Sequence, residues 1–310
     1  MKNKKIFITG GAGYLGSNLV EDLYNDNEIT VFSRDEAKHY FLKKKYPKIN
    51  CIIGDVRNFH LLNKSSKGHD IGIFSASLKQ IEAVDSNVSE SNQVIIQGAL
   101  NSREIAENHL DAACFISSDK SRSATTIYGA MKFVAGESFI VNSDKVKGPN
   151  LSSAIYGNVI NSTGSIIPLI WNFIKNNKEL TLYSEDMTRF FIPVDESVNL
   201  IKFALTKNGY NVIPNSQSMK IKHLFEIFKE EFGLKYKIGR PRISEKIHEI
   251  LISEEESSRV TMKNNYFLMH YEKLAEKNIL NKKELSSKNC CISKDDLYKL
   301  LEENNYFNPL

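Results

Sequence analysis

The sequence predicts an α/β protein with a doubly wound parallel sheet and a smaller C-terminal substrate-binding domain. Three observations lead to this fold class. Short apolar segments alternate with amphipathic ones through the first half of the chain, a glycine-rich loop joins the first such pair, and the alternation becomes irregular after about residue 156. Alternation of this kind is typical of a parallel sheet that helices cover on both faces.

The predicted strands are short runs of apolar, often β-branched residues. They are Lys5–Ile8, Ile29–Phe32, Cys51–Ile53, Ile71–Phe74, Ala112–Ile116 and Leu151–Ile155. The predicted helices repeat apolar positions with a 3.6-residue period. They are Leu15–Tyr24, Val94–Asn108, Tyr128–Val141, Ile166–Lys175, Glu196–Thr206, Lys222–Glu231 and Lys294–Glu303. We expect a first domain over residues 1–155 and a mainly substrate-binding second domain over 156–310, with the segment near 190–215 able to return to the first sheet.

The bulk composition excludes several classes of protein. The chain has 310 residues, of which 41% are apolar and 25% charged, as in ordinary globular proteins. Its net charge of +4 is small and scattered, so we expect no nucleic-acid partner. No apolar stretch approaches the roughly 18 residues of a membrane span, and the run Ile6–Thr9 is cut by Gly10 before it could form a signal-peptide core. We therefore expect no membrane association.

Cysteines and histidines are few and dispersed. The four cysteines form no C-x-x-C motif, and Cys290 and Cys291 are adjacent, a spacing that would strain a disulfide. We interpret all four as reduced thiols of a cytoplasmic protein. The seven histidines do not cluster at ligand spacing, so the sequence predicts no metal site.

A glycine-rich loop follows the first predicted strand and opens the first helix, with glycines at Gly10, Gly13 and Gly16. Glycines at this spacing allow a tight turn, a close approach of the backbone to a pyrophosphate, and tight packing of helix on strand. The helix N-terminus, at Tyr14 and Leu15, would then bind the phosphate charge. In this context dinucleotide binding is favoured over a plain strand–turn–helix, and the fold is predicted to be of the Rossmann type.

The end of the second strand selects the cofactor. Ser33 and Arg34 come first there and favour NADP, because an arginine accommodates the 2′-phosphate, whereas the following Asp35 is the kind of residue that favours NAD. After the third strand, Asp55 and Val56 are predicted to meet the adenine, although an aspartate at this place can equally cap a helix.

A candidate catalytic group follows the fifth strand. Ser118, Asp119 and Lys120 end that strand, and Tyr128 and Lys132 lie four residues apart on the next predicted helix, hence on one face of it. An ammonium beside a phenol lowers the pKa of the phenol. Such a tyrosine can take a proton from a substrate hydroxyl while hydride leaves to a nicotinamide.

These motifs resemble those of the extended short-chain dehydrogenases/reductases. Within that superfamily the chain resembles the UDP-N-acetylglucosamine 4,6-dehydratases of capsule and flagellin-glycan biosynthesis, which carry a T-D-K triplet followed by Y-x-x-x-K. Here the triplet is Ser118–Lys120, and Tyr128 falls nine residues after Asp119, as in the family. Further segments also resemble motifs of this family. Ser77–Ile81 resembles A-L-K-H-V, Tyr156–Val159 resembles Y-G-N-V, and Gly164–Ser165 resembles G-S. Met187–Phe190 resembles M-T-R-F, and Arg242–Glu249 resembles R-P-G-E-K-L-H-E.

The resemblance implies a role for each catalytic residue. Tyr128 would deprotonate O4 of the sugar while Ser118 hydrogen-bonds that oxygen. Lys120 would be the base at C5 and Asp119 the acid that protonates the departing C6 hydroxyl, after which hydride returns to C6. Lys132 would serve both catalysis and cofactor binding. The resemblance leaves the stereochemistry at C5 open, and we expect a homo-oligomer.

The same resemblance supplies candidate substrate contacts. Arg189 and Arg242 are predicted to bind the UDP pyrophosphate, because guanidinium groups suit phosphate oxygens. Asn158 is predicted to contact phosphate or uracil, Lys79 the sugar or a phosphate, and Glu245 belongs to the same substrate-binding set. Each of these could instead form a surface ion pair, and for Lys79 this alternative is strongest.

Some positions depart from the family pattern. Ile155 and Ile95 stand where the family has arginine and asparagine, Ser123-Ala124 replaces Asn-Pro, and Ile243-Ser244 replaces Pro-Gly. Two alternatives therefore stay open. A nucleotide-sugar epimerase or reductase of the same fold would need Tyr128 but not the Asp119–Lys120 pair, and a non-catalytic NADP-binding protein would need neither.

Overall fold

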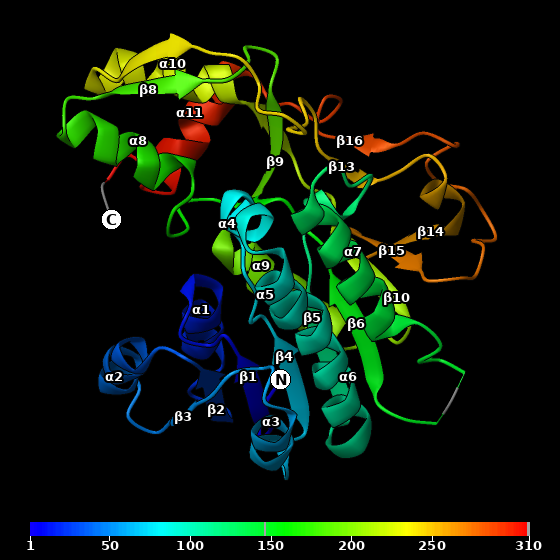
Figure 1. Ribbon diagram of the computed structural model, residues 1–310. Coiled ribbons are helices and arrows are strands. Elements are labelled where there is room, and N and C mark those ends of the chain that lie inside the picture. The colour runs from blue at the N-terminus through cyan, green and yellow to red at the C-terminus, as the bar shows by residue number, and fades with distance from the viewer. Residues whose placement is uncertain (146, 309–310) are drawn as a thin grey trace.

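A large sheet runs through the centre of the molecule (Figure 1). Across residues 1–145 and 147–308, which the computed structural model describes, nine strands form this sheet in the order β14-β15-β10-β6-β5-β4-β1-β2-β3. The strands are β1 (Lys5–Thr9), β2 (Glu28–Ser33), β3 (Asn50–Ile53), β4 (Ile71–Phe74), β5 (Ala112–Ile116), β6 (Asn150–Ala154), β10 (Tyr210–Pro214), β14 (Val260–Lys263) and β15 (Tyr266–His270). From β3 to β10 every neighbouring pair is parallel, and β15 is antiparallel to both β10 and β14.

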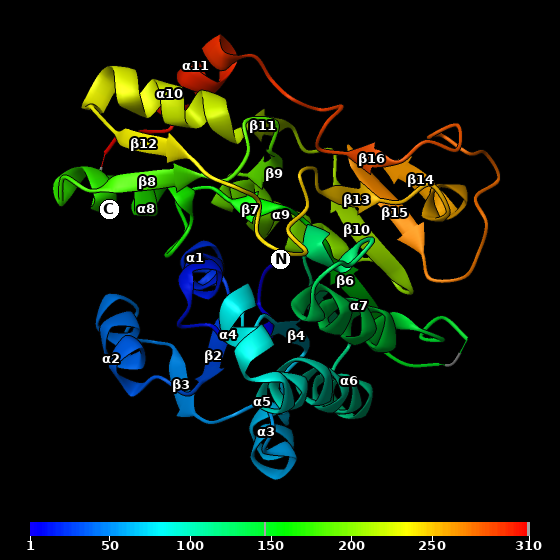
Figure 2. The same ribbon diagram turned by 45° about the horizontal axis from the view of Figure 1, so that its top comes forward.

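Helices cover both faces of the sheet, because its buried strands alternate their apolar side chains. In β1, Ile6 and Ile8 pack into one core with α1 and α9, whereas Phe7 packs into another with α3, α6 and α7. Figure 2 shows α3, α6 and α7 together on their side of the sheet. The helices are α1 (Tyr14–Leu23), α2 (Glu36–Lys45), α3 (Phe59–Ser66), α4 (Ile81–Ser86), α5 (Val88–Asn92), the π-helical turn η1 (Gln93–Gln97), α6 (Gly98–His109), α7 (Ile127–Ile140) and α9 (Val194–Ala204). The predicted fold class is confirmed.

A second lobe lies beside the sheet, around a core formed largely by α8, α10 and α11 (Figure 1). Its small sheets are β11-β9-β7, β12-β8 and β13-β16. Its elements are β7 (Asn158–Val159), α8 (Ile166–Lys175), β8 (Glu179–Leu182), β9 (Thr188–Ile192), β11 (Ser218–Lys220), α10 (Ile221–Phe232), β12 (Lys235–Ile238), β13 (Ile250–Ile252), β16 (Leu285–Ser286) and α11 (Lys294–Glu303). The expected boundary at residue 155 stays a prediction, and β10, β14 and β15 from the second half lie in the large sheet.

The predicted elements of the first half lie close to those observed. Two strands, Ile71–Phe74 and Ala112–Ile116, have the predicted bounds, and the helix expected over Val94–Asn108 begins as the π-helical turn η1 before continuing as α6. The short strands of the second lobe escaped prediction, because a run of two to five residues shows no clear period. Among the described residues, no helix has the length and apolar character that crossing a membrane requires.

The close approach of α1 to the glycine loop gives a first prediction. A Cβ added to Gly16 would lie 2.4 Å from the Cα of Gly11 and 2.5 Å from the carbonyl oxygen of Gly10. Because both atoms belong to the backbone, they cannot rotate away, and we expect Gly16→Ala to lower the free energy of unfolding by about 1–3 kcal/mol in urea titrations. Gly136→Ala is the matched control, since its Cβ would lie at an ordinary 3.5 Å from Ser117 Oγ. Equal stability of the two variants would contradict this account.

Candidate functional site

The glycine loop lies at the carboxyl edge of the sheet, between β1 and α1. Gly10 has a φ of 70°, and a Cβ there would come within 2.8 Å of the Ala76 nitrogen, so glycine is required. The amide of Gly13 donates to Gly10 O at 2.9 Å and makes the turn tight. Gly13 is also the N-cap of α1 and has no side chain to offer its amides. Tyr14 and Leu15 follow it in the first turn, so this N-terminus is suited to a phosphate.

At the end of β2, the acidic residue already has a structural role. The Asp35 carboxylate accepts a hydrogen bond from the Lys38 amide at 3.0 Å and caps α2. Ser33 Oγ lies 2.6 Å from His39 Nε2. Arg34 is more than half exposed and lies 3.7 Å from Asp55. Of the residues weighed for cofactor choice, the arginine thus remains accessible while the aspartate is engaged.

Asp55 does not cap a helix. Its carboxylate accepts hydrogen bonds from the Arg57 backbone amide and from Arg57 Nε and Nη2, and Asn58 caps α3 instead. Arg57 holds the pKa of Asp55 below its ordinary value. Val56 is buried, and its carbonyl accepts from Asn101 Nδ2 at 2.9 Å. Sequence reasoning missed Arg57, which adds a second arginine to this edge.

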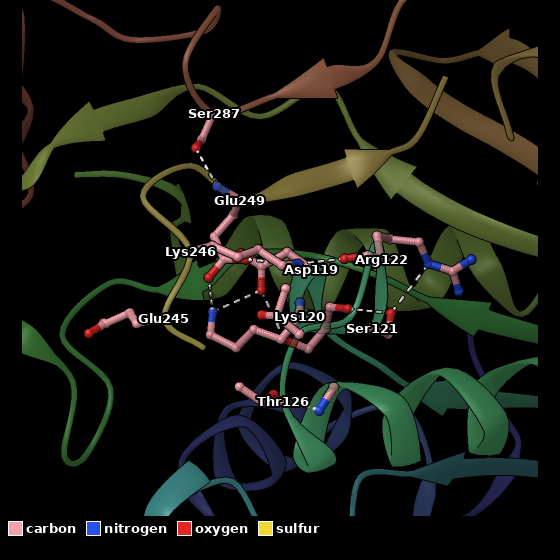
Figure 3. Close-up of polar contacts among 12 residues, drawn as sticks. Asp119, Lys120, Ser121, Arg122, Thr126, Glu245, Lys246, Glu249 and Ser287 are labelled. Atoms are coloured by element: carbon pink, nitrogen blue, oxygen red, sulfur yellow. Dashed lines mark hydrogen bonds and ion pairs between the residues drawn. The ribbon is translucent and has the colours of Figure 1, made fainter. Parts of the chain in front are cut away.

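The triplet after β5 forms a compact polar turn (Figure 3). Ser118 is the N-cap of the short 3-10 turn η2 (Asp119–Ser121). Ser118 Oγ donates to Asp119 Oδ1 at 2.9 Å, and Lys120 Nζ donates to the same oxygen at 3.0 Å. The Asp119 side chain is fully buried, and its Oδ2 has no hydrogen-bond partner among the described residues. Burial, reinforced by the negative charge of Glu249, raises the pKa of Asp119 above its ordinary value, against the opposing effect of the Lys120 charge.

Lys120 lies among oxygens from two further parts of the chain. Its Nζ is 3.4 Å from Asn158 Oδ1 on β7 and 3.4 Å from Glu249 Oε1, which Figure 3 shows. Burial lowers the pKa of Lys120, but the carboxylates of Asp119 and Glu249 raise it more, and the net pKa lies above the ordinary value. Lys120 is therefore an ammonium in this structure.

Tyr128 and Lys132 share one face of α7, as their spacing predicted. Thr126 caps this helix, accepting from the Gly129 amide at 3.1 Å. Burial raises the pKa of Tyr128 to about 12, while the positive charge of Lys120 opposes this shift. Lys132 Nζ donates to the carbonyl of Ile116 at 2.6 Å, and burial lowers the pKa of Lys132 to about 7.

The expected lowering of the Tyr128 pKa by Lys132 is therefore wrong for this structure. Lys132 is turned toward the end of β5, where its Nζ binds a backbone carbonyl. The cation that acts on the phenol is Lys120.

The predicted substrate residues divide into two groups. Arg189, on β9, is buried, and its Nη1 donates to the carbonyls of Thr188 and Ile247. Its other atoms face carboxylates: Nη2 lies 3.2 Å from Glu245 Oε1 and Nε 3.8 Å from Glu249 Oε1. Asn158 thus contacts Lys120, Arg189 shares the Glu249 carboxylate with Lys120, and Glu245 contacts Arg189.

Arg242 and Lys79 lie apart from that group. Arg242 is half exposed, forms an ion pair with Glu82 of α4 at 2.7 Å, and stacks on the Tyr183 ring. Lys79 Nζ donates to the carbonyl of Thr163. Both therefore have partners that are not phosphates in this structure, and their substrate roles stay predictions.

Sequence reasoning missed a set of buried charges that hold the triplet in place. Arg122 is fully buried and bridges Glu137 of α7, at 2.8 Å, and Glu256, at 2.6 Å. Lys246 Nζ donates to the carbonyl of Arg122 at 2.6 Å and lies 3.5 Å from Glu249. Arg122 lies more than a hundred residues from Glu256 and from Lys246 in the sequence, so no local pattern could have linked it to them.

Comparison with known proteins identifies the family of this chain. A model of the family described as "Polysaccharide biosynthesis protein" matches residues 6–271. The chain belongs to this family. Its fold and motifs are those of an extended short-chain dehydrogenase/reductase, and the resemblance to the UDP-N-acetylglucosamine 4,6-dehydratases is confirmed.

Several relatives of this chain are named for their reactions. The "UDP-N-acetylglucosamine 4,6-dehydratase (inverting)" of Campylobacter jejuni subsp. jejuni serotype O:23/36 is 32% identical over 276 residues, which are 85% of this chain and 82% of that protein. The "UDP-glucose 4-epimerase" of Rickettsia canadensis is also 32% identical, over 86% of this chain and 82% of that protein. The crystal structure of Pen from Bacillus thuringiensis superposes with a TM-score of 0.91 at 26% identity, over 98% and 99% of the two chains.

The Arg122 bridge predicts a large effect on stability. Arg122→Met would leave Glu137 and Glu256 without their shared cation. Because breaking a buried ion pair from one side costs roughly 3–5 kcal/mol, we expect a loss of that order in the free energy of unfolding, measured with urea. Arg103→Met is the control, because its ion pair with Glu107 is more exposed. A loss below about 1 kcal/mol, the usual value of a surface pair, would contradict the bridge.

Proposed function

We propose that this protein is an NADP-dependent nucleotide-sugar 4,6-dehydratase, with UDP-N-acetylglucosamine as its substrate and a UDP-4-keto-6-deoxy-hexosamine as its product. One observation carries the proposal. Asp119 and Lys120, the acid and the base that elimination needs, contact each other and both act electrostatically on Tyr128, the group that oxidation needs. The named dehydratase relatives support the same reaction.

The cofactor would lie along the carboxyl edge of the sheet. The glycine turn, with Gly10 at positive φ and Gly13 at the start of α1, fits a pyrophosphate. Arg34 would meet the 2′-phosphate of NADP, since Asp35 is occupied in capping α2. Lys132 would hold the nicotinamide ribose. When bound, NADP⁺ supplies a hydride acceptor for C4 and afterwards the donor for C6.

Tyr128 begins the reaction on the protein side. Its phenolate oxygen would take the O4 proton of the sugar as the C4–H bond is lost, and Ser118 would hydrogen-bond O4. The pKa of about 12 means that the phenol needs help to ionise. The Lys120 ammonium supplies it, because its positive charge favours the phenolate.

Elimination requires a base and an acid, and we assign these roles to Lys120 and Asp119. The 4-ketone makes the C5 proton acidic, and Lys120, once neutral, would remove it. Asp119, whose pKa is raised by burial, would donate a proton to O6, so that the hydroxyl leaves as water. The substrate would be held by Arg189, Arg242, Asn158, Lys79 and Glu245.

The second candidate is a nucleotide-sugar 4-epimerase, which the 32% identity to UDP-glucose 4-epimerases favours. This reaction uses C4 oxidation and reduction only. It would give Asp119 and Lys120 no chemistry, although they form the buried polar centre of the site. The same fold could also carry a reductase.

The mass of the product and the behaviour of three variants distinguish the dehydratase from the epimerase. With NADP⁺ and UDP-N-acetylglucosamine, we expect the product to be lighter by one water. Lys120→Met and Asp119→Asn should each slow this loss by about a hundred-fold or more while a transient NADPH absorbance persists, because hydride leaves C4 before elimination. Tyr128→Phe should abolish both signals.

The controls for this experiment are internal. The NADPH absorbance shows that Lys120→Met and Asp119→Asn still bind cofactor and substrate. A product of unchanged mass with altered stereochemistry would identify the epimerase. Normal dehydration by both Lys120→Met and Asp119→Asn would exclude them as the eliminating pair.

Cofactor choice is tested at Arg34. Arg34→Ala should weaken NADP(H) binding more than NAD(H) binding, because only the former carries a 2′-phosphate. Fluorescence titration of the purified protein with both cofactors measures this. Lys38→Ala is a suitable control, since its side chain pairs with Asp35 nearby. An equal loss of affinity for the two cofactors would mean that Arg34 does not contact the phosphate.

A further inference from the structure

Ser33, the last residue of β2, has a hydroxyl whose direction matters for the proposed cofactor. In the proposed binding mode, Ser33 and Arg34 lie beside the 2′ position of the adenosine ribose, which carries a phosphate in NADP and a hydroxyl in NAD. A serine hydroxyl has one proton and two lone pairs. A phosphate offers acceptor oxygens and therefore needs the proton, whereas a ribose hydroxyl can also use a lone pair. The group that orients the Ser33 proton thus bears on cofactor choice.

His39 is the residue that contacts this hydroxyl. Its Nε2 lies 2.6 Å from Ser33 Oγ, which forms no other hydrogen bond with the described residues. The ring reaches Ser33 because α2 begins directly after Arg34. Asp35 caps the helix, and the His39 amide donates to the Asp35 carbonyl at 3.1 Å. The cap and the first turn of α2 thus fix the His39 ring, which is 4% exposed, against the end of β2.

The second ring nitrogen of His39 decides which partner donates. Burial lowers the pKa of His39 below its ordinary value, against the opposing charge of Asp35, so the ring is neutral near pH 7 and carries one proton. Nδ1 is buried and has no hydrogen-bond partner among the described residues. A proton on Nδ1 would leave a buried N–H group without an acceptor, which native proteins rarely tolerate. The proton therefore belongs on Nε2, which donates it to Ser33 Oγ.

We propose that His39 is a positioning residue for cofactor choice, because its Nε2–H group occupies a lone pair of Ser33 Oγ and leaves the Ser33 proton for an anionic group at the 2′ position. Together with the Arg34 guanidinium, this gives the 2′-phosphate of NADP two donors from adjacent residues. A donor that is oriented before binding loses less entropy than one that rotates freely. The 2′-hydroxyl of NAD gains less, because neutral groups form weaker hydrogen bonds than a phosphate. This assignment rests on the NADP-dependent function proposed above.

A double-mutant cycle tests whether His39 acts through Ser33. Affinities for NADPH and NADH are measured by fluorescence titration of the purified protein without sugar. Ser33→Ala should weaken NADPH binding about 10–100-fold, because a hydrogen bond to a charged group is lost. His39→Leu should weaken it about three- to tenfold, and should have almost no further effect in the Ser33→Ala background. NADH affinity should change much less in each variant.

Two further variants separate this role from packing. His39→Gln keeps an N–H donor close to the place of Nε2 and should retain most of the NADPH affinity. His69→Leu is the matched control, because His69 Nε2 also lies beside a hydroxyl of β2, 2.9 Å from Thr30 Oγ1, but away from the carboxyl end of that strand. It should leave the ratio of the two affinities unchanged. A general defect in β2 would instead lower both affinities in both leucine variants.

The tautomer of His39 can be determined on the wild-type protein. In protein labelled with ¹⁵N in the histidine rings, the NMR shifts of the two ring nitrogens show which one carries the proton, and His39→Gln identifies the signals. We expect the proton on Nε2 both with and without NADPH. This measurement does not depend on whether His39→Leu folds.

Each result decides the proposal. A proton on Nδ1 with NADPH bound overturns it, and so do additive effects of Ser33→Ala and His39→Leu, or equal losses of NADPH and NADH affinity in His39→Leu. Preferential binding of NADH by the wild type overturns the NADP assignment and this role with it. Preferential binding of NADPH with a non-additive cycle, in a protein that releases no water from UDP-N-acetylglucosamine, supports the role of His39 and overturns the dehydratase function alone.

Discussion

The charges buried where the second lobe meets the triplet are the constraint on which the site depends. Three basic and three acidic side chains face one another there, and they are Lys120, Arg189, Lys246, Asp119, Glu245 and Glu249. Charges can be removed from water only when each finds an opposite partner with good geometry. The triplet and the segment around Glu249 therefore fix each other's positions, and neither has this geometry alone.

The sheet supplies the second half of the site. Because Ile6 and Ile8 face one core and Phe7 the other, helices cover both faces of the sheet, and ligands of such sheets bind at the carboxyl edge of the strands. The glycine turn at Gly10 and the triplet after β5 both lie at this edge. A dinucleotide on the turn and a sugar against the triplet would thus meet without any rearrangement of the sheet.

Local sequence patterns predicted those features of the molecule that depend on residues close together in the sequence. The strands, the glycine turn and the shared face of Tyr128 and Lys132 follow from residue type and spacing, and the structure has them. The electrostatics could not be predicted in this way. The expected effect of Lys132 on Tyr128 failed because the direction of a lysine side chain depends on which carbonyl lies within reach, here that of Ile116. The contacts of Glu249 with Lys120 and Arg189 could not be predicted either, because these partners lie far from it in the sequence.

The return of the chain to the large sheet has a consequence for stability. β10 pairs with β6, and β15 covers the other side of β10, so strands from the second half protect the edge of the first. A polypeptide that stopped at residue 155 would expose the unpaired backbone of β6, whose Ser152 and Ser153 are fully buried in the whole protein. Such an edge invites aggregation. The first half of the chain therefore depends on strands of the second half to cover this edge, and we expect it to be unstable when it is produced alone.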